Sequence, residues 1–175
     1  MKATRIGQFV QLAALVVFAG CPGEAPAGKR AFAKLDARSA SAVQGTATFT
    51  ESGSQVALTL NVTGATPGEH GAHLHAIGDC SAADATSAMG HWNPDTTMMH
   101  GLPAATSHHM GDLGNFTVAA DGTGQLTFTG DWSIGTGEPN DILEKAIIVH
   151  ANVDDGTTQT PPGNAGARVA CGVVK

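Results

Sequence analysis

The feature that most constrains the fold of this 175-residue chain is a succession of short alternating segments separated by Gly-rich turns. Residues 55–62 place four apolar side chains on one side of a predicted strand and the intervening residues on the other. Residues 43–50 alternate in the same way, and the sequence Glu-Ser-Gly-Ser joins the two segments. The pattern predicts a β-hairpin with one buried face.

Further segments of similar length extend this pattern along the chain. Gly accounts for 23 of the 175 residues, which disfavours helices, and no segment shows a strong helical period. Six more strands are predicted at residues 32–37, 72–77, 115–119, 124–129, 145–151 and 169–174. Eight short strands without a helix predict an all-β fold, either an antiparallel sandwich or a barrel.

Two long segments do not fit this pattern. Residues 78–113 and 152–167 lack alternation and are rich in Gly, Pro, Asp and Thr. Loops longer than ~12–15 residues inside a compact domain are usually functional or disordered. The first segment contains four histidines, so we expect a bound ligand to order it.

The N-terminal segment is typical of an export signal. Two basic residues precede ten mostly apolar ones, too few to span a ~30 Å hydrocarbon core. The sequence Phe-Ala-Gly-Cys that follows resembles a bacterial lipobox, with Phe18 in place of the usual Leu, and predicts lipid attachment to Cys21. We expect a signal peptide at residues 1–20, the attachment Cys and a flexible tether at 21–34, and the folded domain at 35–175.

The three cysteines, Cys21, Cys80 and Cys171, are an odd number for an exported protein. A lipidated Cys21 would leave Cys80 and Cys171 to form a disulfide, which an oxidising compartment permits. The alternatives are secretion without a lipid on Cys21 and two buried thiols. The expected location is the bacterial cell envelope or periplasm, with the lipid held in a membrane.

The charge of the chain excludes one class of partner. From Asp36 onward the sequence has fourteen acidic and four basic side chains, a formal charge of −10. Because no cluster of Lys and Arg occurs beyond Lys29-Arg30, nucleic acid is not an expected partner. We expect membrane contact only through the lipid on Cys21, and a monomer or a homodimer.

All eight histidines lie between positions 70 and 150, which indicates a metal site. His73 and His75 are two residues apart on a predicted strand and therefore share a face. His150 ends another strand and could supply a third nitrogen. Three nitrogen donors and a carboxylate suit tetrahedral Zn²⁺, and the loop residues that could provide them are His91, His100, His109 and Asp112.

These motifs together resemble a bacterial copper/zinc superoxide dismutase. The resemblance rests on six segments that follow one another through the domain with matching spacing: GEHGAHLHAIGD from Gly68, GHWNP from Gly90, HGLP from His100, HHMGDLGN from His108, KAIIVH from Lys145 and GNAGARVACGVV from Gly163. It implies an eight-stranded antiparallel Greek-key barrel or sandwich, immunoglobulin-like, with two long functional loops. It also implies dismutation of superoxide to O₂ and H₂O₂, which in the envelope would protect against extracytoplasmic superoxide.

The resemblance implies a role for each residue of the site, with one copper and one zinc ion per subunit. The copper ligands would be His73, His75, His91 and His150. The zinc ligands would be His91, His100, His109 and Asp112, so that His91 bridges both ions and acts in catalysis. Asp154 would bind the outer nitrogens of His73 and His100, Arg168 would be the active-site arginine, and Cys80 and Cys171 would be the family disulfide. His70 and His108 match no family role and are expected to be exposed.

Three alternatives can be weighed against this interpretation. A lipid-anchored periplasmic protein that buffers copper and zinc without turnover would need neither a shared histidine nor Arg168. A cupin-type enzyme would need a Glu shortly after the His73–His75 pair, and none occurs at positions 76–80. A copper-only dismutase would lack the loop ligands. The loop before Arg168 has no Lys, although several family members use Lys there to attract superoxide.

Overall fold

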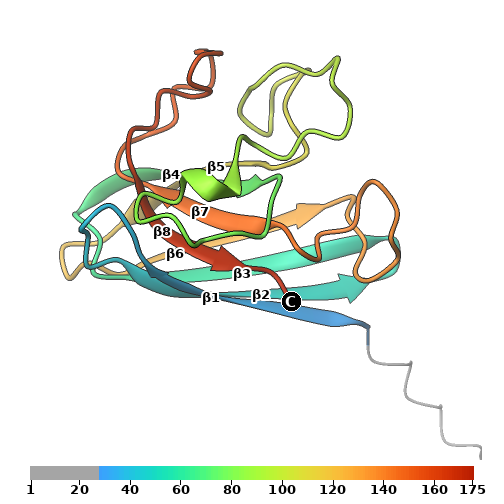
Figure 1. The fold of residues 1–175 in the computed structure, drawn as a ribbon, viewed down its shortest axis with the longest axis horizontal. Coiled ribbons are helices and arrows are strands. Elements are labelled where there is room, and N and C mark those ends of the chain that lie inside the picture. The colour runs from blue at the N-terminus through green and yellow to red at the C-terminus, as the bar shows by residue number, and fades with distance from the viewer. Residues whose placement is uncertain (1–27) are drawn as a thin grey trace, which may run out of the picture.

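Eight antiparallel strands close into a barrel in the computed structural model, which describes residues 28–175 (Figure 1). The strands follow one another around the barrel in the order β1-β2-β3-β6-β5-β4-β7-β8. Their bounds are β1 Arg30–Ala37, β2 Gln44–Ser52, β3 Gln55–Thr63, β4 Gly68–His75, β5 Asp112–Val118, β6 Gly124–Gly130, β7 Ala146–His150 and β8 Arg168–Val173. This architecture confirms the predicted all-β fold of eight strands.

The hairpin expected at residues 43–62 is present as β2 and β3. The two strands pair from Gln44 opposite Thr63 to Ser52 opposite Gln55. Gly53 in the connecting turn has a φ of 63°, a conformation that glycine adopts without steric cost. The alternating apolar side chains of β3 are all buried, as the period-two pattern predicts.

Strands β4 and β7 are neighbours in the barrel and carry His73, His75 and His150. All five residues of β7 are buried, because β4 and β8 pair with its two edges and side chains cover both faces. The strand predicted at residues 145–151 is thus present, and burial on both faces accounts for its uninterrupted apolar run Ile147-Ile148-Val149. Strand β4 begins at Gly68 and ends at His75, four residues earlier at its start than expected, and β5 begins at Asp112 rather than Asn115.

Strand β1 changes the expected boundary between tether and domain. It begins at Arg30 and pairs with β2 from that residue onward, with Arg30 opposite Thr50. Ala31 and Ala33 are buried in the core. Residues 30–34 therefore belong to the sheet, which agrees with the strand predicted at 32–37 and extends it into the segment expected as tether. The signal peptide, Cys21 and the rest of the tether lie outside the described residues.

The two long loops lie together above one side of the barrel (Figure 1). They comprise the segment between β4 and β5, which contains a short 3-10 helix at Thr86–Ala88, and the segment between β7 and β8. A disulfide joins Cys80 in the first loop to Cys171 in β8, with 5.8 Å between their Cα atoms, and so confirms the expected pairing. Within residues 28–175, no helix is long and apolar enough to cross a membrane.

Candidate metal centre

Three histidines of one cluster lie on neighbouring strands. His73 and His75 are buried residues on the same side of β4, and His150 ends the adjacent strand β7. Because β4 and β7 pair with Ala72 opposite Val149, the His73 and His150 rings come within 4.8 Å of each other, measured between centroids. The barrel backbone thus sets the positions of these three imidazoles.

His91 joins this cluster through a short backbone pairing outside the main strands. It forms an antiparallel bridge with His75, and the neighbouring Trp92 donates its N–H to the Leu74 carbonyl at 2.8 Å. Trp92 is itself buried in the core. The His91 ring stacks on that of His73 with centroids 3.9 Å apart, so His91 is held against the barrel although it belongs to a loop by sequence.

A second cluster surrounds the carboxylate of Asp112 at the start of β5. The Nδ1 atoms of His91, His100 and His109 lie 2.8, 3.1 and 3.5 Å from its oxygens. The backbone N–H of His109 also donates to Asp112 Oδ2 at 2.8 Å. Three rings therefore direct the same nitrogen at one buried carboxylate.

Two groups of metal-ligating side chains occur in the described part of the chain, and they share one residue. Within each group, one potential ligand atom per residue lies within 4.8 Å of all the others. The first group is His73, His75, His91 and His150, and the second is His91, His100, His109 and Asp112. The structure brings together every residue that the sequence placed in each set.

Buried nitrogens without hydrogen-bond partners test whether metal ions fit these clusters. Such atoms usually have an explanation, for example a missing ion. In the described residues the buried histidine nitrogens in this condition are His73 Nδ1, His75 Nε2, His100 Nδ1, His109 Nδ1 and His150 Nε2. Each belongs to one of the two clusters. Imidazole suits copper and zinc, so the donor set fits both ions.

The opposite ring nitrogens of the cluster histidines are hydrogen-bonded. Asp154 Oδ2 lies 2.6 Å from His73 Nε2, and its Oδ1 lies 3.0 Å from His100 Nε2. Both rings therefore direct Nε2–H at the carboxylate and keep Nδ1 for a ligand role. This is the contact expected for Asp154, and it links the two clusters beneath their shared histidine.

Other partners of the ring nitrogens are not visible in the sequence. His75 Nδ1 lies 2.8 Å from the Met89 carbonyl oxygen, and His150 Nδ1 lies 3.2 Å from that of Gly166. Backbone carbonyls occur at every residue, so no sequence signal distinguishes these two. Asn115 could have been suspected from its polar side chain on a strand. Its amide oxygen accepts the Asp154 N–H at 2.7 Å.

Gln159 holds the loop that carries His100. Its side-chain oxygen accepts the His100 N–H at 2.9 Å, and its amide nitrogen donates to the His100 carbonyl at 3.0 Å. The two long loops are therefore joined directly at a ligand of the second cluster. A polar residue in a long loop gives no signal that would identify this role.

Burial and carboxylates shift the pKa values of the cluster in opposite directions. Burial disfavours the charged form and lowers the pKa of His73 to about 4, and it also lowers the pKa values of His75 and His150 well below the usual range. Burial also opposes the charged form of His100, but the adjacent carboxylates of Asp112 and Asp154 outweigh it and raise its pKa to about 9. The neighbouring histidines in turn hold the pKa of both carboxyls well below the usual range despite burial.

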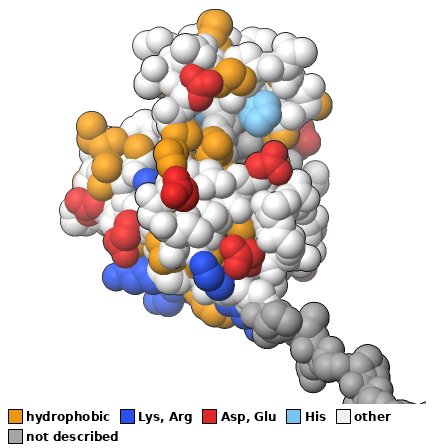
Figure 2. Space-filling view, turned by 90° about the vertical axis from the view of Figure 1, so that its right-hand side faces the viewer, with side chains coloured by type: hydrophobic (Ala, Val, Ile, Leu, Met, Phe, Trp, Pro, Cys, Tyr) orange, Lys and Arg blue, Asp and Glu red, His pale blue; other side chains and the backbone are white. Residues whose placement is uncertain are grey.

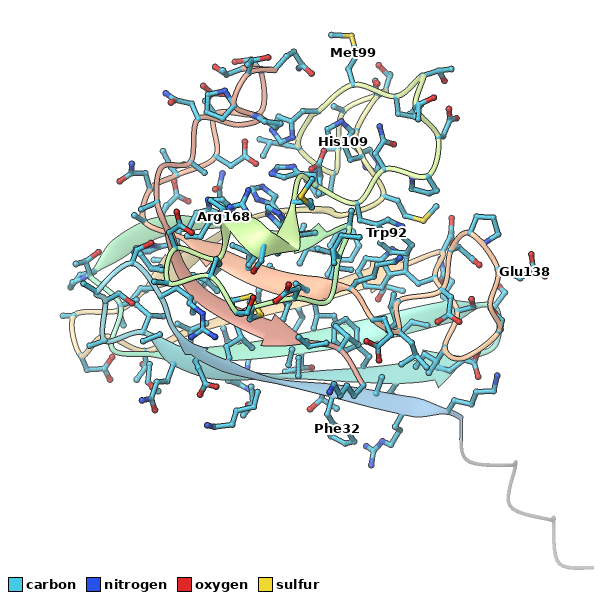
Figure 3. The ribbon with its side chains drawn as sticks, viewed as in Figure 1. Phe32, Trp92, Met99, His109, Glu138 and Arg168 are labelled. Atoms are coloured by element: carbon cyan, nitrogen blue, oxygen red, sulfur yellow. A yellow bond between two sulfur atoms is a disulfide. The ribbon has the colours of Figure 1, made fainter. Side chains whose placement is uncertain are left out.

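Arg168 lies at the start of β8, beside the first cluster (Figure 3). Its Nη1 atom donates to the Ala85 carbonyl at 2.7 Å. Burial lowers the pKa of its guanidinium, but arginine remains charged at neutral pH. The guanidinium also acts on the pKa values of His75 and His150, which places its positive charge near both rings.

The expectation that His70 is exposed is wrong. Only 3% of its surface is accessible. Its Nδ1 lies 2.8 Å from the His150 carbonyl oxygen, and its Nε2 lies 2.8 Å from that of Thr66. It is buried because it joins the turn before β4 to the end of β7. His108 is half-buried rather than exposed, and its Nδ1 lies 3.0 Å from the His109 carbonyl oxygen.

Comparisons with known proteins agree with this geometry. Residues 43–174 match the family model described as copper/zinc superoxide dismutase. The chain is 39% identical over 142 residues to superoxide dismutase [Cu-Zn] 2 of Brassica juncea, covering 78% of this chain and 91% of that protein. It also resembles the crystal structure of the clock protein EA4, with a TM-score of 0.72, 32% identity, and coverage of 88% of this chain and 98% of that one.

Proposed function

This chain belongs to the copper/zinc superoxide dismutase family, and on that premise we propose that it removes superoxide in the bacterial cell envelope, attached to a membrane by a lipid on Cys21. As a member of that family it is an oxidoreductase that uses copper and zinc. The observation that carries the proposal for the site is the convergence of unpartnered buried nitrogens on two clusters that share His91.

We propose the ligand sets as follows. Copper is held by His73, His75, His91 and His150, and zinc by His91, His100, His109 and Asp112. Ligands about 2.0–2.2 Å from a tetrahedral ion lie roughly 3.3–3.6 Å apart. The distances of 2.8 to 3.5 Å around Asp112 are close to that spacing, so small side-chain movements suffice.

The reaction converts two superoxide anions and two protons into O₂ and H₂O₂. When bound, copper supplies the one-electron exchange, and zinc, which is redox-inert, supplies fixed positive charge. The protein must deliver protons and admit an anion. His91 belongs to both clusters, and its Nδ1 lies at Asp112 in the second cluster. Its Nε2 is therefore the nitrogen that can hold a proton at the first cluster and pass it to the substrate.

Asp154 acts by orienting rings rather than by touching substrate. It holds His73 and His100 in the tautomer that leaves Nδ1 free. The carboxylate is itself held by the Gly156 N–H, which donates to Oδ1 at 2.7 Å. By orienting both rings, this carboxylate favours metal binding at the two clusters.

Arg168 gives the site a positive charge within an acidic domain. Most acidic side chains lie in the solvated loops and strands, and at ~0.15 M salt the Debye length is ~8 Å, so distant charges are largely screened. Two divalent ions and Arg168 would dominate the local field. We propose that this field attracts superoxide to the open side of the copper site.

The location rests on the sequence before the described residues. The apolar run at 9–18 and the lipobox-like sequence ending at Cys21 support export and lipid attachment. The Cys80–Cys171 disulfide is consistent with an oxidising compartment. Retention of this protein in the membrane fraction until lipid removal would support the proposal, and a Cys21→Ser variant in the soluble periplasmic fraction is the expected contrast.

The function is tested by dismutation assays combined with the visible spectrum of bound copper. We expect the fully metallated chain to dismutate superoxide, and zinc removal to shift the copper spectrum because the ions share a ligand. A His91→Ala variant should lose this shift, whereas His108→Ala, which alters a histidine outside both clusters, should retain it. Binding of both ions without turnover would contradict the proposal and favour a metal buffer.

A further inference from the structure

The outer side of β1 carries an exposed aromatic ring between two cations. Burial alternates along the strand, so that Arg30, Phe32 and Lys34 are exposed and the residues between them are buried. Phe32 is 54% exposed, although it is a large hydrophobic side chain on a regular strand. Because single exposed hydrophobic side chains are common, the case for a contact surface depends on the cations around this ring.

A third basic residue, Lys175, pairs with Phe32 through the backbone. The Phe32 N–H donates to the Lys175 carbonyl at 2.8 Å, and the Lys175 N–H donates to the Phe32 carbonyl at 2.9 Å. On the other side of β1, Phe32 lies opposite Thr48 of β2. We call Arg30, Phe32, Lys34 and Lys175 the β1 face.

The β1 face differs in charge from the rest of the domain. Residues 28–175 contain seven basic and fourteen acidic side chains, and three of the seven cations lie on this face. The acidic residue of the same strand face is Asp36, which pairs with Lys34 at 2.7 Å. In Figure 2, Lys and Arg side chains gather at the lower edge of the molecule, whereas acidic side chains are spread over the surface above them.

The β1 face also lies far from the metal centre. Phe32 points away from the barrel on the side opposite His109 and Met99 (Figure 3). Cys21 precedes Arg30 by nine residues, and nine extended residues span no more than about 30 Å. A lipid on Cys21 would therefore keep the β1 face close to the membrane surface.

We propose that the β1 face docks on an anionic phospholipid bilayer, with Phe32 at the level of the headgroups and the three cations against lipid phosphates. This inference rests on the proposed lipid attachment, and it departs from the expectation that only the lipid contacts the membrane. Aromatic rings favour the membrane interface, and basic side chains are attracted to anionic lipids. The tether raises the effective concentration of the face at the bilayer. Docking in this orientation leaves the metal centre open to the aqueous phase.

The test uses the full lipid-bearing chain on vesicles of phosphatidylcholine with or without phosphatidylglycerol. A Phe32→Trp variant reports insertion, because Trp92 and Trp132 are only 4% and 2% exposed and give a constant background. Brominated phospholipids should quench the new tryptophan on anionic vesicles. A Met99→Trp variant, whose site is 56% exposed on the opposite side of the molecule, should not be quenched.

A charge variant separates docking from attachment. Adding Arg30→Gln and Lys34→Gln to the reporter should leave flotation with the vesicles intact and reduce the ratio of docked to undocked chain roughly 30-fold. Lys145→Gln is the matched control, since this cation lies over the Trp92 ring and not on the β1 face. Raising the salt concentration should act like the double variant.

Each contrary result overturns a distinct part of the proposal. Flotation without quenching of the Phe32→Trp reporter overturns docking and leaves the lipid anchor in place. Failure to float overturns both. Equal quenching on vesicles without phosphatidylglycerol overturns the role of the cations. A dimer that Phe32→Glu dissociates would make a second copy of the chain the occupant. Dismutation by the metallated chain, measured in parallel, tests the enzyme independently.

Discussion

The Nε2 atom of His73 lies 2.6 Å from the Oδ2 atom of Asp154, and both side chains are fully buried. The contact fixes the ring so that its other nitrogen faces the cluster of histidines. Because Asp154 holds His100 in the same way, one carboxylate orients a proposed ligand of each metal ion. The predictions below begin from this pair.

Replacing Asp154 with Asn should weaken zinc binding by roughly 10- to 100-fold, since the amide cannot accept a hydrogen from both rings. Competition with a chelator, followed by metal analysis, measures the change. Asp155→Asn is the matched control, because Asp155 is exposed and bonds to its own turn at Thr157 and Thr158. Equal zinc affinity in the two variants would contradict the orienting role.

Replacing Arg168 with Glu should lower kcat/KM for superoxide about tenfold or more at low ionic strength, because the local field then repels the anion. The effect should shrink as salt is added. Pulse-radiolysis rates over a range of salt concentrations measure it. Lys145→Glu changes the net charge equally at a site that faces Trp92 and serves as the control. Unchanged turnover at low salt would exclude electrostatic attraction by Arg168.

Replacing Cys80 and Cys171 with Ser should reduce the free energy of unfolding of the protein by about 2–5 kcal/mol. The bond closes a loop with a sequence separation of 91 residues, so its loss greatly increases the freedom of the unfolded chain. Urea titration under oxidising conditions measures the difference between the variant and the parent. The parent treated with a reductant should match the double variant, and a difference between them would indicate that Ser alters the fold by itself.

The metal-free protein should be most stable near pH 6.5. His73, His75, His109 and His150 have lowered pKa values through burial, so below pH 6.5 they take up protons more readily in the unfolded chain, and stability falls. His100 has a pKa raised to about 9, so its contribution is complete below 6.5 and is lost as the pH rises through 9. Asp112 and Asp154, with lowered pKa values, add to the loss below about pH 4.

Chemical denaturation from pH 3 to 10 in the presence of a chelator measures this profile. The acid limb should be the steeper one, since more groups bind protons there. His100→Gln should remove the alkaline limb, and His108→Gln should preserve it. Stability that increases from pH 6.5 to pH 9 in the parent would contradict the assignment of the raised pKa to His100.

Much of the barrel could be predicted from the sequence because its strands bury one face. The alternation in β2 and β3 and the Ile-Ile-Val run of β7 follow directly from burial. The first two residues of β1, Arg30 and Ala31, could not be predicted, because the small apolar and charged side chains around them also suit a tether. Their strand pairing depends on β2, which the local sequence does not show.

The residues of the two clusters could be predicted because histidine clusters are rare and their spacing matched a family. The contacts that hold the rings could be predicted only in part. Asp154 has a recognisable side chain, whereas the carbonyls of Met89 and Gly166 act through backbone atoms. The burial of His70 could not be predicted, because its two partners are the backbone carbonyls of Thr66 and His150. Such partners leave no signal in the sequence.

The backbone bridge between His75 and His91 attaches the first cluster to the barrel, whereas the second cluster depends more on a loop. Every member of the first cluster is anchored in the hydrogen-bonded framework, while His100 and His109 depend on the long excursion between β4 and β5. A related chain with a shorter segment after Trp92 would lose the second cluster and keep all four residues of the first. In such a chain, loss of the proposed zinc site would leave the proposed copper site in place.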